Sequence, residues 1–301
     1  MAKIVSIHSF RAGTGKSNIT ANVAAQLALQ GNRVGVIDAD IPSPGIHTLF
    51  GIDEKDMGKT LNDYLWGRCD VEETAYDVSA HVSEGAVAAM GGDIYLIPSS
   101  NHAGEITRVL RDGYDVGLLN DGLRAVINKL GLDYLFIDTH PGLNEETLLS
   151  IAISDLLIIV LRTDQQDFQG TAVTVDVARK LNVPYLSLVI NKVPFTDYDF
   201  VEELRRQAGD EVRRQVEEIS AFFEKRQRQE SERQRRQIEE LRRQAEQTYA
   251  IPVIAILPLS EGVARMRSAD LFSLRVPDHP FSTGIRSIVA VIEATEVEAA
   301  E

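Results

Sequence analysis

The sequence predicts an α/β fold, a doubly wound and mostly parallel sheet flanked by helices, with a protruding α-helical insertion. Short β-branched runs alternate with segments of helical pattern, and most runs are apolar throughout, as is typical of parallel strands covered on both faces. One segment between strands is much longer than a crossover needs, which predicts the insertion. The expected strands are Lys3–His8, Arg33–Asp38, Asp93–Pro98, Asp133–Asp138, Leu156–Leu161, Tyr185–Asn191 and Ile251–Leu257.

The composition is that of an ordinary globular chain and excludes several classes of protein. Of the 301 residues, 44% are hydrophobic and 25% charged, and the net charge of −14 gives no overall attraction to DNA or anionic lipid. The single cysteine, Cys69, cannot form an internal disulfide or complete a cysteine-rich metal site. The first residues do not resemble a secretory signal peptide. No apolar run approaches the length of about 18 residues that a membrane-spanning helix needs. We therefore expect a cytoplasmic protein with no transmembrane segment and no clear membrane-anchoring helix.

A glycine-rich turn joins the first expected strand to a helical pattern that begins at Asn18. This is the context of a phosphate-binding loop, in which inward-pointing backbone N–H groups and a helix N-terminus attract phosphate. Lys16 would reach the β- and γ-phosphates, and the Ser17 hydroxyl would complete a Mg²⁺ shell. The alternative, a glycine turn with a chance Gly-Lys-Ser, is disfavoured by the flanking elements. The expected loop residues are Arg11, Ala12, Gly13, Thr14, Gly15, Lys16 and Ser17, with Asn18 after them.

The loop departs from the usual Gly-x4-Gly-Lys-Ser/Thr spacing because Phe10 stands at the first glycine position. It instead resembles the deviant Walker A box, Lys-Gly-Gly-x-Gly-Lys-Ser/Thr, of the ParA/MinD family of P-loop ATPases. Arg11 replaces the signature lysine and Ala12 replaces a glycine. The resemblance implies ATP or ADP with Mg²⁺ as cofactors and a homodimer in the ATP state, in which Arg11 reaches the partner's ATP. Arginine keeps the charge and can bridge two phosphate oxygens.

Two carboxylates end the second expected strand, where strand alternation places Asp38 and Asp40 on one face of the extended chain. The resemblance implies that both lie in switch I. It makes Asp40 the residue that helps to polarise the attacking water, with Lys16 and Arg11 as the other catalytic residues, and it makes Asp38 a support of the Mg²⁺ site. The alternative is a pair of acidic turn residues without a chemical role.

A further apolar strand ends at Asp138, as a Walker B strand does, so we expect Asp138 to hold a Mg²⁺-bound water beside Ser17. The residues that follow, Thr139–Leu143, resemble the switch II of the family. His140 could act there as a proton shuttle. Phosphoryl transfer needs positioning more than acid–base catalysis, which favours an ordinary role in the switch loop.

Two later strand ends supply the expected base pocket. The resemblance implies that Asn191 hydrogen-bonds adenine and that Pro258 and Leu259 flank the base. An asparagine at a strand end is usually only a turn residue. The order of these residues, after the phosphate loop and Asp138, is what supports the assignment.

The segment between Asn191 and Ile251 holds 59 residues, where a crossover of about 20 would suffice. Its heptapeptide Glu-Glu-Leu-Arg-Arg-Gln-Ala starts at Glu202 and recurs unchanged at Glu239, an offset of 37 residues. The composition, rich in Gln, Glu and Arg, favours helix. We expect an inserted or duplicated helical arm with a break near Gly209.

The expected organisation is therefore a single P-loop ATPase domain of residues 1–198 and 249–297. Residues 199–248 form the inserted arm and residues 298–301 an acidic tail. Within the arm, Lys225–Arg236 carries six basic and two acidic residues. A solvated helix face is the favoured interpretation, and non-specific contact with DNA is the alternative.

The resemblance implies an ATP-hydrolysing switch that dimerises around Mg·ATP and positions or partitions a cellular cargo through an unidentified partner. The alternative is a nucleotide-dependent scaffold with little turnover that recruits a partner through the arm. Iron–sulfur carriers of the same fold need cysteines at a dimer interface, and the lone Cys69 argues against that function. No motif indicates the substrate pocket that an amidoligase would need.

Overall fold

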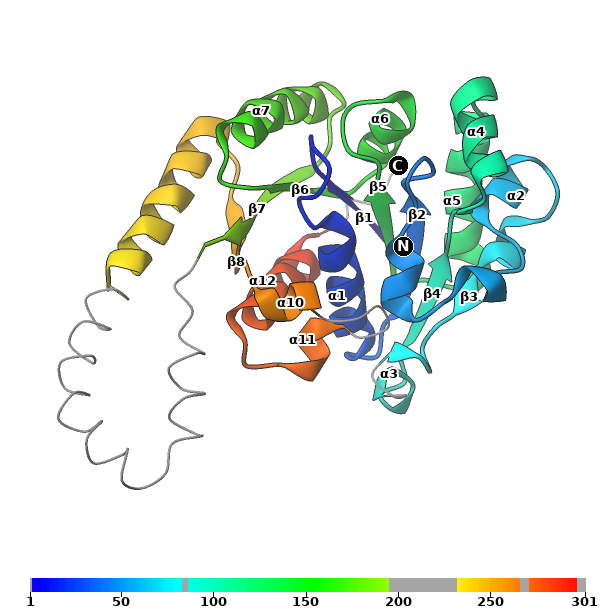
Figure 1. Cartoon of the computed structure of the whole chain (residues 1–301), viewed down its shortest axis with the longest axis horizontal. Coiled ribbons are helices and arrows are strands. Elements are labelled where there is room, and N and C mark those ends of the chain that lie inside the picture. Colours follow the sequence, from blue (N-terminus) through cyan, green and yellow to red (C-terminus); the bar gives the residue numbers. More distant parts are fainter. Residues whose placement is uncertain (1, 83–85, 195–231, 266–270, 297–301) are drawn as a thin grey trace.

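The computed structural model describes residues 2–82, 86–194, 232–265 and 271–296. Eight strands form one sheet in the order β3-β4-β2-β5-β1-β6-β7-β8, with helices on both faces (Figure 1). Neighbouring strands are parallel except for β3, which pairs antiparallel with β4. The predicted fold class is confirmed.

All seven expected strands are present, with ends shifted by at most two residues. The strands are β1 Lys3–His8, β2 Arg33–Ala39, β3 Tyr76–Asp77, β4 Asp93–Ile97, β5 Tyr134–Thr139, β6 Leu156–Leu161, β7 Tyr185–Val193 and β8 Val253–Pro258. The labelled helices are α1 Lys16–Ala28, α2 Leu61–Leu65, α3 Ala86–Ala89, α4 Ala103–Asp112, α5 Val116–Leu130, α6 Glu145–Ala152, α7 Gln165–Lys180, α10 Glu261–Arg265, α11 Phe272–Arg275 and α12 Pro280–Ala294. Only β3 was not expected, because two residues are too few for an alternation pattern.

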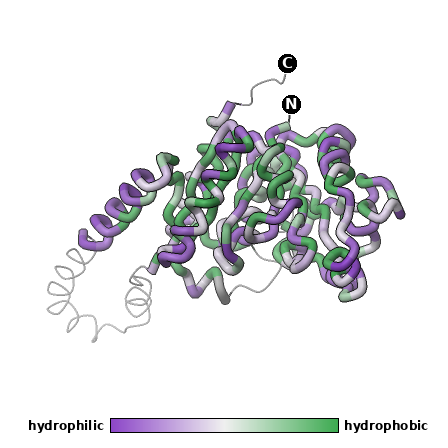
Figure 2. Tube along the Cα trace, turned by 90° about the horizontal axis from the view of Figure 1, so that it is seen from above, coloured by the Kyte–Doolittle hydropathy of each residue, from purple (hydrophilic) through white to green (hydrophobic). Residues whose placement is uncertain are grey.

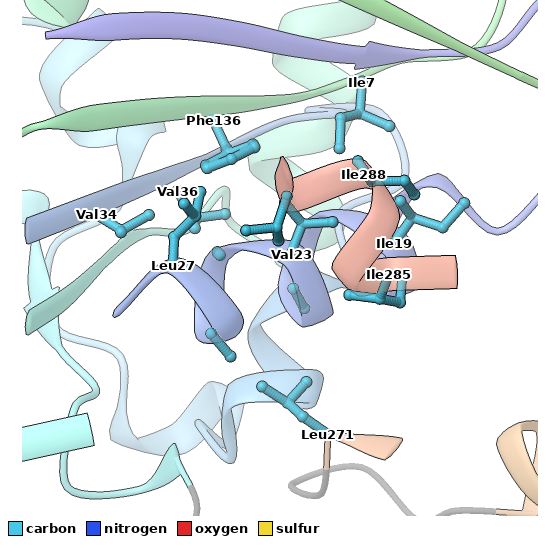
Figure 3. Close-up of a cluster of buried hydrophobic side chains, with 14 of the residues drawn as sticks. Ile7, Ile19, Val23, Leu27, Val34, Val36, Phe136, Leu271, Ile285 and Ile288 are labelled. Atoms are coloured by element: carbon cyan, nitrogen blue, oxygen red, sulfur yellow. The ribbon is translucent and has the colours of Figure 1, made fainter. Parts of the chain in front are cut away.

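One face of the sheet is covered by α1 and α12, which form a single core with the strands. Leu27 of α1 lies over Val34 and Val36 of β2, while Ile285 and Ile288 of α12 pack beside the start of α1 (Figure 3). All of these side chains are fully buried. This packing fixes α1 under the sheet and therefore fixes where its N-terminus points.

The opposite face carries two further cores. Helices α2 and α5 cover β2 and β5, and α7 covers β6 and β7. Consecutive residues of one strand enter different cores: Ile158 of β6 faces α1 and α12, whereas Leu157 and Ile159 face α7. Strands buried on both faces explain why the runs in the sequence are apolar without alternation.

A helix over residues 232–249, which covers the last part of the expected arm, leads back to the sheet and is drawn in yellow to orange in Figure 1. Its outer end is mostly hydrophilic (Figure 2), but Ala245 and Tyr249 near its inner end are buried in the core under α7. Arg242 donates to the carbonyl of Val253 at the start of β8, and Glu246 accepts from the N–H of Val253 at 3.0 Å. The inner end of this helix is thus packed into the body of the protein.

Residues 195–231 lie outside the described residues, and with them the expected break at Gly209 and the first copy of the heptapeptide. The second copy lies on the helix over 232–249. No helix in the part of the chain that the structure describes is long and apolar enough to cross a membrane.

Candidate functional site

The glycine-rich loop lies at the carboxyl end of β1 and leads directly into α1. Gly13 and Gly15 adopt positive φ values of 75° and 96°, which L-residues with side chains rarely adopt. Gly15 is the N-cap of α1, and no side chain among the described residues caps this helix. The first N–H groups of α1 are therefore left for a ligand, and an anion is the ligand that a helix N-terminus favours.

Lys16 is buried, with 7% of the residue exposed, and three carboxylates act on it. Burial lowers the pKa of Lys16, while Asp138, Asp40 and Asp38 oppose that shift. Asp38 and Asp138 are register partners on β2 and β5, so the sheet itself brings them together. The structure thus gathers four of the expected site residues at one edge of the sheet.

Asp138 is fully buried, and its Oδ1 has no hydrogen-bond partner among the described residues. Burial raises the pKa of Asp138 to about 6, against the opposing effects of Ser17 and Lys16. An unused carboxylate oxygen beside the Ser17 hydroxyl is a donor set of the kind that Mg²⁺ prefers. These two residues fit the expected metal, whose coordination would satisfy the orphaned oxygen.

Asp38 is also fully buried, but its oxygens are engaged by the loop that follows β2. They accept from the N–H groups of Asp40 at 3.2 Å and Gly45 at 3.0 Å. Burial and the charge of Asp138 raise the pKa of Asp38 well above its usual value. Asp38 therefore shapes the loop that carries Asp40, and it can support a metal site through that loop.

Asp40 joins the two expected switch loops. Its Oδ1 lies 2.6 Å from Nδ1 of His140 and also accepts from the hydroxyl of Ser43 at 2.8 Å. The carbonyl of His140 accepts from Thr147 in α6 at 3.2 Å. His140 thus holds the carboxylate that the resemblance assigns to water activation, a contact that fits a positioning role in the loop.

His8 lies directly below these loops and was not singled out in the sequence. The Thr139 hydroxyl donates to the carbonyl of Ile7, so it accepts from Nδ1 of His8 at 2.8 Å. Burial, with smaller effects from Lys16 and His140, lowers the pKa of His8 to about 3. His8 is therefore neutral at physiological pH and adds no charge beneath the loop.

Arg11 turns toward the N-terminus of α7 rather than into the loop. It donates to Gln166, and its guanidinium lies 3.7 Å from Asp164 and 3.9 Å from Asp167. Arg162 forms ion pairs with the same two carboxylates, and its Nε lies 2.9 Å from Asp167. The sequence contained no signal for this cluster, because the contact joins positions more than 150 residues apart.

Phe10, which breaks the usual loop spacing, packs against Gly170 of α7. A Cβ placed on Gly170 would lie 2.1 Å from Cδ1 of Phe10 and 2.8 Å from its Cβ. The large side chain at position 10 is thus accommodated by a glycine in the facing helix. Phe10 and Arg11 together attach the phosphate loop to α7.

The ends of β7 and β8 meet beside the loop, as Val193 and Pro258 are register partners and the N–H of Leu259 donates to the Val193 carbonyl at 2.8 Å. Leu259 is 55% exposed. Asn191 is buried and its Nδ2 donates to the carbonyl of Thr14 at 2.7 Å. The expected base-pocket residues therefore lie together on one side of the loop. Lys192, which was not expected here, also touches the loop.

A family model described as an AAA domain matches residues 2–184, more than half of the chain. The chain belongs to this AAA domain family. The match includes β1 to α7 and therefore the glycine-rich loop, both expected switch loops and Asp138. The base-pocket residues lie beyond it.

Among the curated relatives are two proteins of Methanocaldococcus jannaschii that differ in their names. An uncharacterized ATP-binding protein is 28% identical over 193 residues, which are 64% of this chain and 65% of the relative. An iron–sulfur cluster carrier protein is 32% identical over 197 residues, which are 64% of this chain and 60% of the relative. Each match spans less than two thirds of the relative's own length.

Solved structures of MinD proteins have the same fold. The cell division ATPase MinD of Pyrococcus furiosus superposes with a TM-score of 0.68 at 20% identity, covering 98% of this chain and all (100%) of that one. The septum site-determining protein MinD of Pyrococcus horikoshii, solved with Mg-ADP, gives 0.66 at 19% identity and covers 97% and 96%. With the family match, these likenesses confirm the resemblance to ParA/MinD P-loop ATPases.

Replacement of Gly170 with alanine should displace Phe10 and loosen the loop, because its new Cβ would overlap the ring. We expect Gly170→Ala to lower the free energy of unfolding by about 1–3 kcal/mol and to weaken ADP binding. In a Phe10→Ala background, which removes the ring and keeps only the Cβ at 2.8 Å, the same change should cost less. A double-mutant cycle by denaturant unfolding measures this coupling, and additive effects would contradict the packing.

Asp138→Asn should stabilise the protein without ligand near neutral pH. The pKa of Asp138 is about 6 in the fold and 3.8 in the unfolded chain, so stability falls as the pH rises through that window and the loss persists above it. We expect the variant to gain about 1–3 kcal/mol at pH 7.5 and little at pH 4. Urea unfolding at both pH values, with Asp121→Asn on the surface of α5 as control, checks this. A gain equal at both pH values would refute it.

Proposed function

We propose that this protein is a Mg·ATP-dependent switch of the cytoplasm that dimerises around the nucleotide, hydrolyses it slowly and positions or partitions a cellular cargo. The observation that carries the proposal is the meeting of Lys16 with Asp38, Asp40 and Asp138 beside a glycine-rich loop. An ammonium group suits phosphate, and a carboxylate with an unused oxygen suits a divalent cation. A metal-bound triphosphate satisfies both requirements at once.

The roles of the residues follow from their places in the loop. The N–H groups from Gly13 to Ser17 bind phosphate oxygens, and Lys16 neutralises their charge. Ser17 and Asp138 hold Mg²⁺, which when bound withdraws charge from the phosphates. Asp40, held by His140, orients a water for attack on the terminal phosphate.

A second copy of the chain is the partner that the loop favours. Ala12 and Gly13 are exposed, and the Arg11 side chain is 41% exposed. Arg11 is thus accessible from outside its own subunit. In an ATP-bound dimer it would leave Gln166 and neutralise the facing triphosphate, as an arginine finger does.

The second candidate is a nucleotide-dependent scaffold with little turnover. The engagement of Arg11 by Gln166, Asp164 and Asp167 within one chain supports it, because a held arginine contributes nothing to a partner's active site. The partner would then be recruited through the arm. The helix over 232–249 gives such a surface, since its outer end is hydrophilic and extends beyond the packed residues (Figure 2).

The charges of this helix favour a protein partner or solvent over DNA. Arg233, Arg235 and Arg236 are exposed, but Glu239 and Glu240 follow them on the same helix. The other basic residues of Lys225–Arg236 lie outside the described residues. Non-specific DNA contact remains the less favoured alternative.

The name iron–sulfur cluster carrier belongs to relatives and is not the function we favour. The whole chain has one cysteine, Cys69, which is partly exposed and lies in the turn after α2. Burial raises its pKa, which makes the thiolate scarcer. One such thiol per subunit is a poor ligand set for a cluster.

Lys16→Ala should abolish Mg²⁺-dependent binding of ADP, because it removes the buried ammonium that faces the phosphates. We expect a loss of at least about 100-fold. Isothermal titration calorimetry measures it, with Lys180→Ala at the end of α7 as an exposed control that should bind like the unaltered protein. Tight binding by Lys16→Ala would refute the nucleotide site.

Sedimentation equilibrium with and without Mg·ATP separates the dimeric switch from a monomeric binder, since the switch requires a mass shift toward a dimer.

The rate of ATP hydrolysis separates the switch from the scaffold. Asp40→Ala should reduce steady-state phosphate release by at least about 10-fold while retaining nucleotide binding. A rate at background in the unaltered protein would favour the scaffold.

A further inference from the structure

Two consecutive side chains at the end of β7 reach the same loop. Nδ2 of Asn191 donates to the carbonyl of Thr14, and Nζ of Lys192 donates to the carbonyl of Gly13, both at 2.7 Å. In a regular strand, neighbouring side chains point to opposite faces. A specific departure from strand geometry must therefore bring both to one side.

That departure is present at Lys192. Its φ is +58°, in the left-handed region that non-glycine residues seldom occupy, and the pairing of β7 with β8 is irregular between Ile190 and Val193. The N–H of Lys192 donates to Oδ1 of Asn191 at 2.8 Å, which fixes the turned backbone. Such a conformation persists only where the surroundings determine it.

The two contacts determine which way the loop N–H groups point. In a planar trans peptide the C=O and the following N–H point in opposite directions. Drawing the carbonyls of Gly13 and Thr14 toward β7 therefore turns the N–H groups of Thr14 and Gly15 away from it. These are two successive donors of the glycine-rich loop.

Asn191 and Lys192 contribute differently. Asn191 is 5% exposed and packs so closely that a Cβ on Gly15 would lie 2.5 Å from its Nδ2. Lys192 is exposed, so its hydrogen bond competes with water and is the weaker of the two. Gly13, which Lys192 holds, has open space where a Cβ would stand, so no side chain or backbone group packs on it from that side.

We infer that Asn191 and Lys192 form a positioning pair that holds the phosphate loop in its binding shape before a ligand arrives. Lys192 acts through the loop backbone and not by contact with the base. The identity of the ligand, a diphosphate or triphosphate, rests on the proposed function; the restraint on the loop does not. Preorganised donors bind more tightly because less conformational entropy is lost on binding.

Lys192→Met tests this, since it keeps the length of the side chain and loses the ammonium group. We expect the ¹⁵N order parameters of Thr14 and Gly15 in nucleotide-free protein to fall from about 0.85 toward 0.6. Lys180→Met, at the end of α7, is the matched control and should leave both values unchanged. Unchanged values in Lys192→Met would overturn the proposal.

Binding gives the second measurement. Calorimetry with Mg²⁺ and either ADP or inorganic pyrophosphate should show both ligands weakened about two- to tenfold by Lys192→Met, as expected for one hydrogen bond. If Lys192→Met weakened the binding of ADP but not of pyrophosphate, this would indicate contact with the base and overturn the proposal. If the unaltered protein binds neither ligand, the proposed function fails, while the order parameters still decide whether Lys192 restrains the loop.

Discussion

The site depends on an excess of buried acidic groups over buried basic groups. Lys16 is the ammonium that acts on Asp38 and Asp138, two fully buried carboxylates on neighbouring strands, with Asp40 close by. Removing several acids from water is unfavourable unless positive charge or protons compensate. The raised pKa of Asp138 and of Asp38 expresses that cost directly. A divalent cation would relieve it, so the site is destabilised in a way that binding reverses.

The sheet enforces this arrangement. Parallel strands buried on both faces place their carboxyl ends at one edge, and the register of β2 with β5 puts Asp38 opposite Asp138. Because apolar cores pack against both faces of the sheet, Asp38 and Asp138 cannot move away from Lys16. The packing that stabilises the fold therefore also keeps these carboxylates buried, which is unfavourable for their charged form.

The sequence was a good guide where function lies in local pattern and a poor one where it lies in packing. Apolar runs located the strands, and glycine spacing located the loop, because each signal depends on near neighbours in the chain. The fit of Phe10 against Gly170 and the capture of Arg11 by Gln166 join residues some 155–160 positions apart, and no local pattern encodes them. Lys192 was overlooked because its role needs a left-handed backbone that the letters do not reveal. The roles assigned to individual site residues, and the arm boundaries at 199 and 248, stay predictions.

The contact of the helix over 232–249 with β8 has a consequence for solubility. β8 ends the sheet, and an unpaired strand edge is a template for association with other chains. Arg242 and Glu246 occupy the backbone carbonyl and N–H of Val253 and so close part of that edge. The inner turns of this helix thus restrict the pairing of another chain with that part of the edge. Replacing both Arg242 and Glu246 would therefore expose these two backbone groups of β8 to pairing with another chain.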